Sequence, residues 1–135
     1  MLYLKSAEKQ NIQRHSYKMH NLDYILHQIR TEIKTDSVTG HGKASIRATA
    51  RLADVDQSTL GKSLKTGEGL APSELVKFLA SNGFESEVLA KFSETGIPDL
   101  AVAAILEYYA FEAGRYIKPQ AQLVYRAFSR IGIRA

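Results

Sequence analysis

The sequence contains no cysteine among its 135 residues. This absence excludes disulfide bonds, a thiol nucleophile and a cysteine-ligated zinc site. The sequence also lacks a run of eighteen apolar residues, so no transmembrane helix is expected. Its first ten residues, MLYLKSAEKQ, lack the apolar core of a secretion signal. We therefore expect a cytoplasmic protein.

Basic charge is concentrated in the first half of the chain. Residues 1–66 contain eleven Lys and Arg against six Asp and Glu, a net charge of +5, whereas residues 67–135 contain seven against eight, a net charge of −1. A basic region suits a polyanionic partner such as nucleic acid, but charge of this size does not identify one.

Residues 1–20 are polar and weakly patterned, and we predict a flexible N-terminal arm there, followed by one domain over residues 21–135. The segment that follows the arm carries two competing patterns. Its apolar residues, from Leu22 to Ile33, have helical spacing, but QIRTEIKT alternates as a half-buried strand does. With the turn-forming Thr-Gly-His-Gly behind it, we predict a β-hairpin of strands Gln28–Asp36 and, approximately, Gly42–Ser45.

From Ile46 onward the pattern is helical. Caps, prolines and apolar spacing predict helices over residues 46–54, 57–65, 72–83, 85–92, 98–114 and from 119 onward. The fifth, PDLAVAAILEYYAFEAG, is apolar on nearly every side, as a central buried helix is. The predicted fold class is mainly α: a helix-turn-helix domain with a small N-terminal β-hairpin and a C-terminal helical bundle.

Several kinds of chemistry are disfavoured by the residues. The letters Gly-Lys-Ser at 61–63 would mark a phosphate-binding loop only if glycine stood five positions earlier, where the sequence has Asp56. The four histidines have no compact ligand spacing with acidic partners. Glu107 and Glu112 lie five apart and so on different helix faces, where they pair more readily with Arg or Tyr than with each other. We expect no catalytic site, no metal and no cofactor.

The segment Thr49–Leu64, TARLADVDQSTLGKSL, fits the helix-turn-helix pattern. Such a motif needs a small residue where the helices cross, a turn residue that tolerates positive φ, an apolar residue at the corner and two inward apolar residues in the second helix. These positions are filled by Ala50, Asp54, Val55, Leu60 and Leu64, although glycine is commonest where Asp54 stands. An ordinary helical hairpin with a solvated polar face is the alternative.

The outward face of the second predicted helix carries short polar side chains and cations. Gln can pair with adenine through two hydrogen bonds, and Lys can reach guanine or a phosphate. The Ser hydroxyl can donate a hydrogen bond to a base edge or accept one from it. Arg47 and Arg51 on the first helix are placed to contact the DNA backbone. The predicted DNA-contacting residues are Gln57, Ser58, Gly61, Lys62, Lys65, Arg47, Arg51 and Lys43.

At these residues the sequence resembles known families. Thr49–Leu64 resembles, without gaps, the helix-turn-helix of Cro-type phage repressors. More broadly, TGHGKASIRATARLADVDQSTL is similar to the N-terminal module of phage antirepressor-like proteins that are also common in cyanobacterial genomes. The resemblance implies a prokaryotic or phage transcriptional regulator that binds double-stranded DNA through Gln57, Ser58 and Lys62. Because antirepressors can act by binding a repressor, a protein–protein interaction module is the alternative.

The C-terminal helices, from about residue 72 to 135, are predicted to form a homodimer. A single recognition helix reads only a few base pairs, so such modules usually bind as two-fold pairs. Tyr108, Tyr109 and Phe111 are the predicted anchors, with Arg126, Arg130 and Arg134 at the rim. The alternative is that one domain buries these apolar faces internally.

Overall fold

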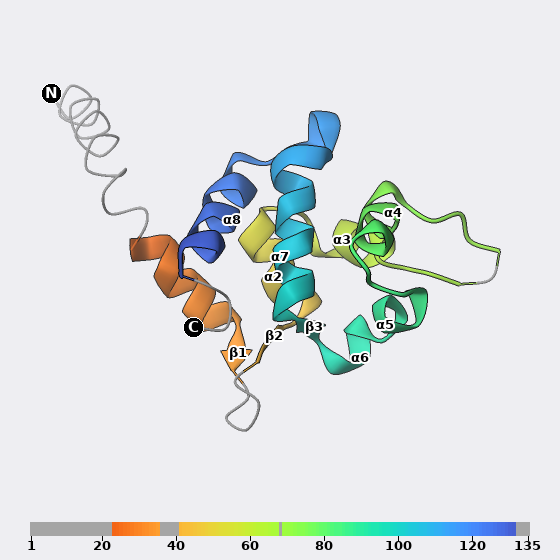
Figure 1. Cartoon of the computed structure of the whole chain (residues 1–135), viewed down its shortest axis with the longest axis horizontal. Coiled ribbons are helices and arrows are strands. Elements are labelled where there is room, and N and C mark those ends of the chain that lie inside the picture. The colour runs from red at the N-terminus through yellow and green to blue at the C-terminus, as the bar shows by residue number, and fades with distance from the viewer. Residues whose placement is uncertain (1–22, 36–40, 68, 132–135) are drawn as a thin grey trace, which may run out of the picture.

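The computed structural model describes residues 23–35, 41–67 and 69–131, and this part of the chain is mainly helical with a small antiparallel sheet (Figure 1). The predicted arm at residues 1–20, most of the predicted hairpin turn and Arg134 lie outside the described residues. The predicted fold class is thus confirmed at the level of a mainly helical chain with a small sheet.

The predicted strand Gln28–Asp36 is wrong over most of its length, because residues 23–32 are helical. Ile25 and Ile29, four residues apart, are each only 4% exposed. The helical spacing of apolar residues therefore prevails over the local alternation, since one helical face buries more apolar surface. Only Lys34–Thr35 forms a strand, β1, and Asp36 lies outside the described residues.

The second predicted strand is confirmed as β2, Gly42–Ala44, and it lies in the middle of a sheet of order β1-β2-β3. The third strand, β3 at Ile97–Pro98, was not predicted. Both neighbours run antiparallel to β2, with Lys34 opposite Lys43 and Ala44 opposite Ile97. The buried carboxylate of Asp99 accepts a hydrogen bond of 3.1 Å from the Gly42 N–H, and this bond fastens the sheet to the start of the central helix.

The predicted helices are present, with shifted ends. The helix predicted over residues 85–92 is replaced by two short helices. The helix predicted over residues 98–114 is α-helical only to Glu107. It continues as a π-helical turn, Tyr108–Glu112, and a 3₁₀ turn, Gly114–Tyr116. The α-helices named in Figure 1 are α2 Ile46–Ala53, α3 Gln57–Ser63, α4 Glu74–Ser81, α5 Ser86–Ala90, α6 Phe92–Thr95, α7 Asp99–Glu107 and α8 Pro119–Ile131.

Helix α7 occupies the centre of the molecule, with α8 on one side and α3 and α4 on the other (Figure 1). Val102, Ile105 and Leu106 are fully buried, as expected for a helix that is apolar on nearly every side. Val124 and Phe128 of α8 are also buried in this core. The chain therefore buries most of the apolar surface that was assigned to a dimer interface.

The charged residues of the central region are accommodated locally. The Glu107 carboxylate accepts a hydrogen bond of 2.9 Å from the Tyr125 hydroxyl, which confirms the expected pairing with tyrosine. This bond, together with partial burial, raises the pKa of Tyr125. Within the described residues, no helix has both the length and the apolar character needed to span a membrane.

Candidate nucleic-acid interface

Helices α2 and α3 are joined by a three-residue turn, Asp54, Val55 and Asp56. Asp54 has φ 60° and ψ 44°, and it is the one residue other than glycine with positive φ in the described part of the chain. The left-handed conformation predicted here is confirmed. It directs the Val55 N–H back to the Ala50 carbonyl oxygen at 2.9 Å, closing the end of α2.

The inward positions of the motif pack as the sequence predicts. Ala50 is 2% exposed, Leu60 is fully buried and Leu64 is 3% exposed. Val55 is half-buried against the same core, at the corner between the two helices. Helices α2 and α3 thus pack closely on each other, with Ala50, Leu60 and Leu64 in the core.

Both helices are capped by side chains at their first residues. The Ser45 hydroxyl oxygen accepts a hydrogen bond of 2.9 Å from the Ala48 N–H at α2, and the Asp56 carboxylate accepts one of 3.1 Å from the Thr59 N–H at α3. The Ser58 hydroxyl also donates to Asp56. The Ser58 hydrogen bond, followed by the backbone bond from Thr59, lowers the pKa of Asp56, because both favour its charged form. The cap is therefore ionised at neutral pH.

The outward face of α3 is open. Gln57, Ser58, Lys62 and Lys65 are exposed, and a Cβ atom built on Gly61 would have no neighbour within 4 Å. Glycine at this position is thus not required by packing inside the chain, although it weakens a helix. Its absence of a side chain leaves room for close approach by an external surface.

Arg47 is part of the same surface. Its Nε donates a hydrogen bond of 3.0 Å to Oε1 of Gln57, so the arginine from α2 orients the amide of the first residue in α3. The Nε2 group of Gln57 is left to donate to a partner.

Arg51 has a different environment from the other predicted contacts. Its Nε and Nη2 donate to the two carboxylate oxygens of Glu32 at 2.7 and 3.2 Å, and the Glu32 side chain is only 12% exposed. The hydrogen bond to Glu32 raises the pKa of Arg51 above its usual value. Arg51 therefore fastens the helix at residues 23–32 to α2, and its charge is already compensated. The ion pair could not be predicted from local spacing, because Glu32 is nineteen residues away.

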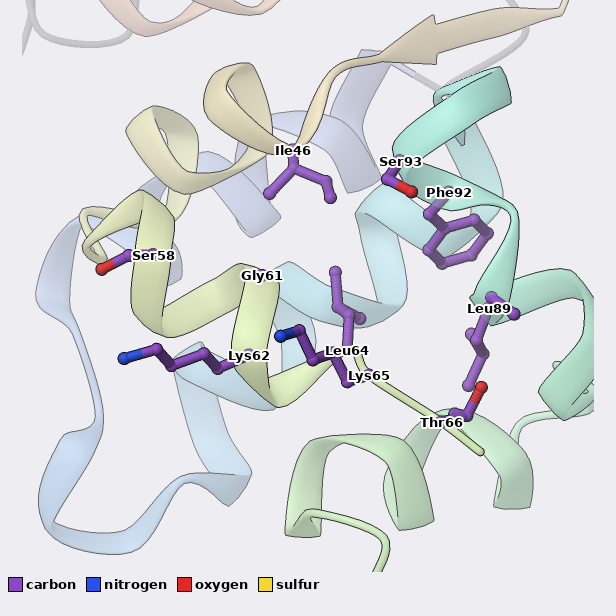
Figure 2. A pocket seen from close by; sticks show the side chains of 11 residues that line it. Ile46, Ser58, Gly61, Lys62, Leu64, Lys65, Thr66, Leu89, Phe92 and Ser93 are labelled. Atoms are coloured by element: carbon purple, nitrogen blue, oxygen red, sulfur yellow. The ribbon is translucent and has the colours of Figure 1, made fainter. Parts of the chain in front are cut away.

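A groove runs beside the outward face of α3. One part has a volume of 440 Å³ and lies between α3 and the helices α5 and α6 (Figure 2). In Figure 2 the side chains of Ile46, Leu64 and Phe92 point toward its middle, whereas the amine of Lys62 points away from α5 and α6. The groove therefore has an apolar floor and a polar rim.

A second hollow, of 720 Å³, adjoins the first, and both are lined by Ile46, Phe92 and Ser93. It brings the sheet and the start of α2 to the same surface. Lys34 was not predicted; it lies opposite Lys43 across the two strands, so it could be found only once the register was known. We call this surface the basic groove: Lys34, Lys43, Arg47, Gln57, Ser58, Gly61, Lys62 and Lys65.

The basic groove carries five cationic side chains, from Lys34, Lys43, Arg47, Lys62 and Lys65, and one carboxylate, Glu94, lines its edge. In the described ranges, no group of three or more His, Cys, Asp or Glu side chains is placed to hold a metal ion. The electrostatics of the surface favour an anionic partner.

The comparisons with known proteins provide no relative for the chain. No protein-family model, no curated protein and no solved structure matches it significantly.

Proposed function

We propose that the chain binds double-stranded DNA in a sequence-specific manner and acts as a transcriptional regulator. The observation that supports this most is the basic groove, because it combines the outward face of α3 with five cations, which come from β1, β2, α2, α3 and the segment that follows α3. The major groove of B-DNA, about 12 Å wide, admits one α-helix, and α3 is the helix offered to it.

The proposed contacts fall into two kinds. Lys34 and Lys43 on the sheet and Arg47 on α2 flank α3, so they suit phosphates and set the position of the protein. Gln57 and Ser58, at the first turn of α3, suit base edges, and Lys62 suits guanine or a phosphate. Arg51 is removed from the set of contacts because Glu32 holds it.

A protein–protein interaction of the antirepressor kind is the second candidate function, and one observation favours it. The basic groove has an apolar floor of Ile46, Leu64 and Phe92, walled by α5 and α6. The charged DNA backbone would gain little from contact with these apolar side chains, whereas a segment of a partner protein could bury its own apolar side chains against them.

We also propose that two copies act together on DNA. The surplus of apolar surface no longer supports this, since Tyr109 and most of the α7 and α8 faces are buried within the chain. The remaining support is that one recognition helix reads few base pairs, and that Phe111 and Leu123 are 45% and 40% exposed.

The test is selection of bound sites from a random double-stranded DNA pool, followed by affinity measurements on the selected site. Gln57→Ala should relax preference at one base pair and cost about 1–3 kcal/mol there. Lys77→Ala, on the exposed face of α4, is the control that should bind as the wild type does. If no site is enriched, or if Gln57→Ala retains full specificity, α3 does not read DNA.

A further inference from the structure

A second pocket, of 500 Å³, lies on a different flank of α3 and shares no lining residue with the basic groove. Three tyrosines line it, Tyr108, Tyr109 and Tyr116, together with the aliphatic side chains of Val55 and Leu75. We call it the tyrosine pocket. Its volume lies in the range of roughly 300–1,000 Å³ that small-molecule sites occupy, and its lining combines these aromatic and aliphatic side chains with polar ones.

The π-helical turn Tyr108–Glu112 shapes one wall of this pocket. The Ala113 N–H donates to the Tyr108 carbonyl oxygen, five residues earlier, at 2.9 Å. Tyr108 and Tyr109 are the first two residues of this turn, and their ring centroids lie 5.1 Å apart in an edge-to-face arrangement. Such turns are uncommon and are frequent at functional sites, because they redirect neighbouring side chains.

The polar groups of the tyrosine pocket carry both signs of charge. Glu74 and Asp56 supply carboxylates from α4 and from the start of α3, and Lys118 supplies an ammonium group from the segment before α8. Glu74 accepts a hydrogen bond of 3.2 Å from the Lys77 ammonium group, and the Asp56 carboxylate caps α3. Lys118 has no ion pair in the described part of the chain, so its charge is available to a ligand.

The tyrosine hydroxyls are available as hydrogen-bond donors. Burial raises the pKa of Tyr109, and burial together with the charge of Glu74 raises the pKa of Tyr108. Both hydroxyls therefore keep their protons at neutral pH.

We propose that the tyrosine pocket binds an aromatic amino acid. The ligand's ring packs against the tyrosines, its ammonium group faces Glu74, and its carboxylate faces Lys118. A ligand with both charges can pair with Glu74 and Lys118 at once, whereas a ligand with one charge can pair with only one of them.

Titration of the ¹⁵N-labelled chain by NMR tests the proposal with three probes. L-phenylalanine carries both charges, phenethylamine lacks the carboxylate, and 3-phenylpropionate lacks the ammonium group. Saturable shifts are expected at the amides of Val55, Ser63 and Tyr109, and L-phenylalanine should bind at least about threefold more tightly than either analogue. Absence of saturable shifts at these amides, or equal affinity for all three probes, would overturn the proposal.

Two variants separate the two charges. Glu74→Gln should weaken binding of L-phenylalanine and phenethylamine about two- to fivefold and leave 3-phenylpropionate unchanged. Lys118→Gln should instead weaken binding of L-phenylalanine and 3-phenylpropionate. Glu87→Gln, exposed on α5 and outside the pocket, is the matched control and should change none of them. If each variant weakens all three probes equally, the charges do not select the ligand. These measurements do not involve DNA, so they are independent of the proposed DNA binding.

Discussion

At the scale of single residues, the turn between α2 and α3 depends on small or unusual side chains. Asp54 adopts the left-handed conformation that glycine adopts most easily, and Ala50 leaves the space in which the two helices cross. Both roles could be predicted from the sequence, because each is set by positions a few residues apart. The bond between Arg51 and Glu32 could not, because it joins elements that only the tertiary fold brings together.

Ala50→Leu tests the crossing of the two helices. Ala50 is 2% exposed, so a larger side chain must push α2 and α3 apart, at a cost of about 1–3 kcal/mol in unfolding free energy. Thermal melting measures the loss. Ala80→Leu, at an exposed position of α4, should leave the melting temperature close to that of the wild type. Equal melting temperatures for Ala50→Leu and the wild type would show that the helices do not cross there.

The two arginines of α2 should behave differently on DNA. Arg47→Gln removes a cation of the basic groove, so the slope of log K against log salt concentration should decrease in magnitude by about one. Arg51→Gln should leave this slope unchanged. Arg51→Gln should instead lower the melting temperature, because it leaves the largely buried Glu32 side chain without its partner. Anisotropy titrations at several salt concentrations distinguish these outcomes. The assignment of Arg51 as a structural residue would be wrong if both variants lowered the salt dependence equally.

At the scale of elements, the sequence predicted helices and strands correctly where the spacing of apolar residues fitted one pattern, and incorrectly where it fitted two. The helices from Ile46 onward follow from caps, prolines and apolar spacing. The segment at residues 23–35 carried two patterns, and its helical face is selected only because the core provides a place to bury Ile25 and Ile29. Strand β3 has only two residues, too few to show an alternating pattern in the sequence. Its pairing with β2 therefore depends on the tertiary fold.

The cap of α3 should make its stability depend on pH. The pKa of Asp56 is lowered in the folded chain from its ordinary value of 3.8, so its stabilising effect is complete above 3.8 and is lost as the pH falls through the lower folded value. Asp56→Ala should therefore lower the melting temperature at pH 7, and the difference from wild type should shrink below pH 3.8.

Ser45→Ala is the matched control for this experiment. It removes the uncharged cap of α2, at a cost of about 0.5–2 kcal/mol, and that loss should not vary with pH. If the two variants show the same pH dependence, ionisation of Asp56 does not carry the effect.

At the scale of the whole molecule, the basic groove is assembled from elements far apart in the sequence. Local spacing could predict the α3 face, but the wall of α5 and α6, the position of Lys34 and the apolar floor depend on the fold. The exposed face of α3 is consequently bordered by α5 and α6.

The oligomeric state should follow from the proposed binding to paired half-sites. Light scattering of the complex with a selected site should give the mass of the DNA plus twice 15.0 kDa. Phe111→Glu, at an exposed apolar position, should shift the protein toward the single-copy complex if this surface forms the contact. Tight binding by one copy would contradict the dimer.

The salt dependence of DNA affinity tests the central claim most directly. Five cations line the basic groove, and each phosphate contact contributes about −0.9 to the slope of log K against log salt concentration, so three to five contacts give an expected slope between about −2.7 and −4.5 per protomer. The Lys62→Gln variant should reduce the magnitude of this slope if Lys62 contacts a phosphate, and the Lys77→Gln variant should not. A slope near zero, or no saturable binding to double-stranded DNA at low salt, would contradict the proposed function.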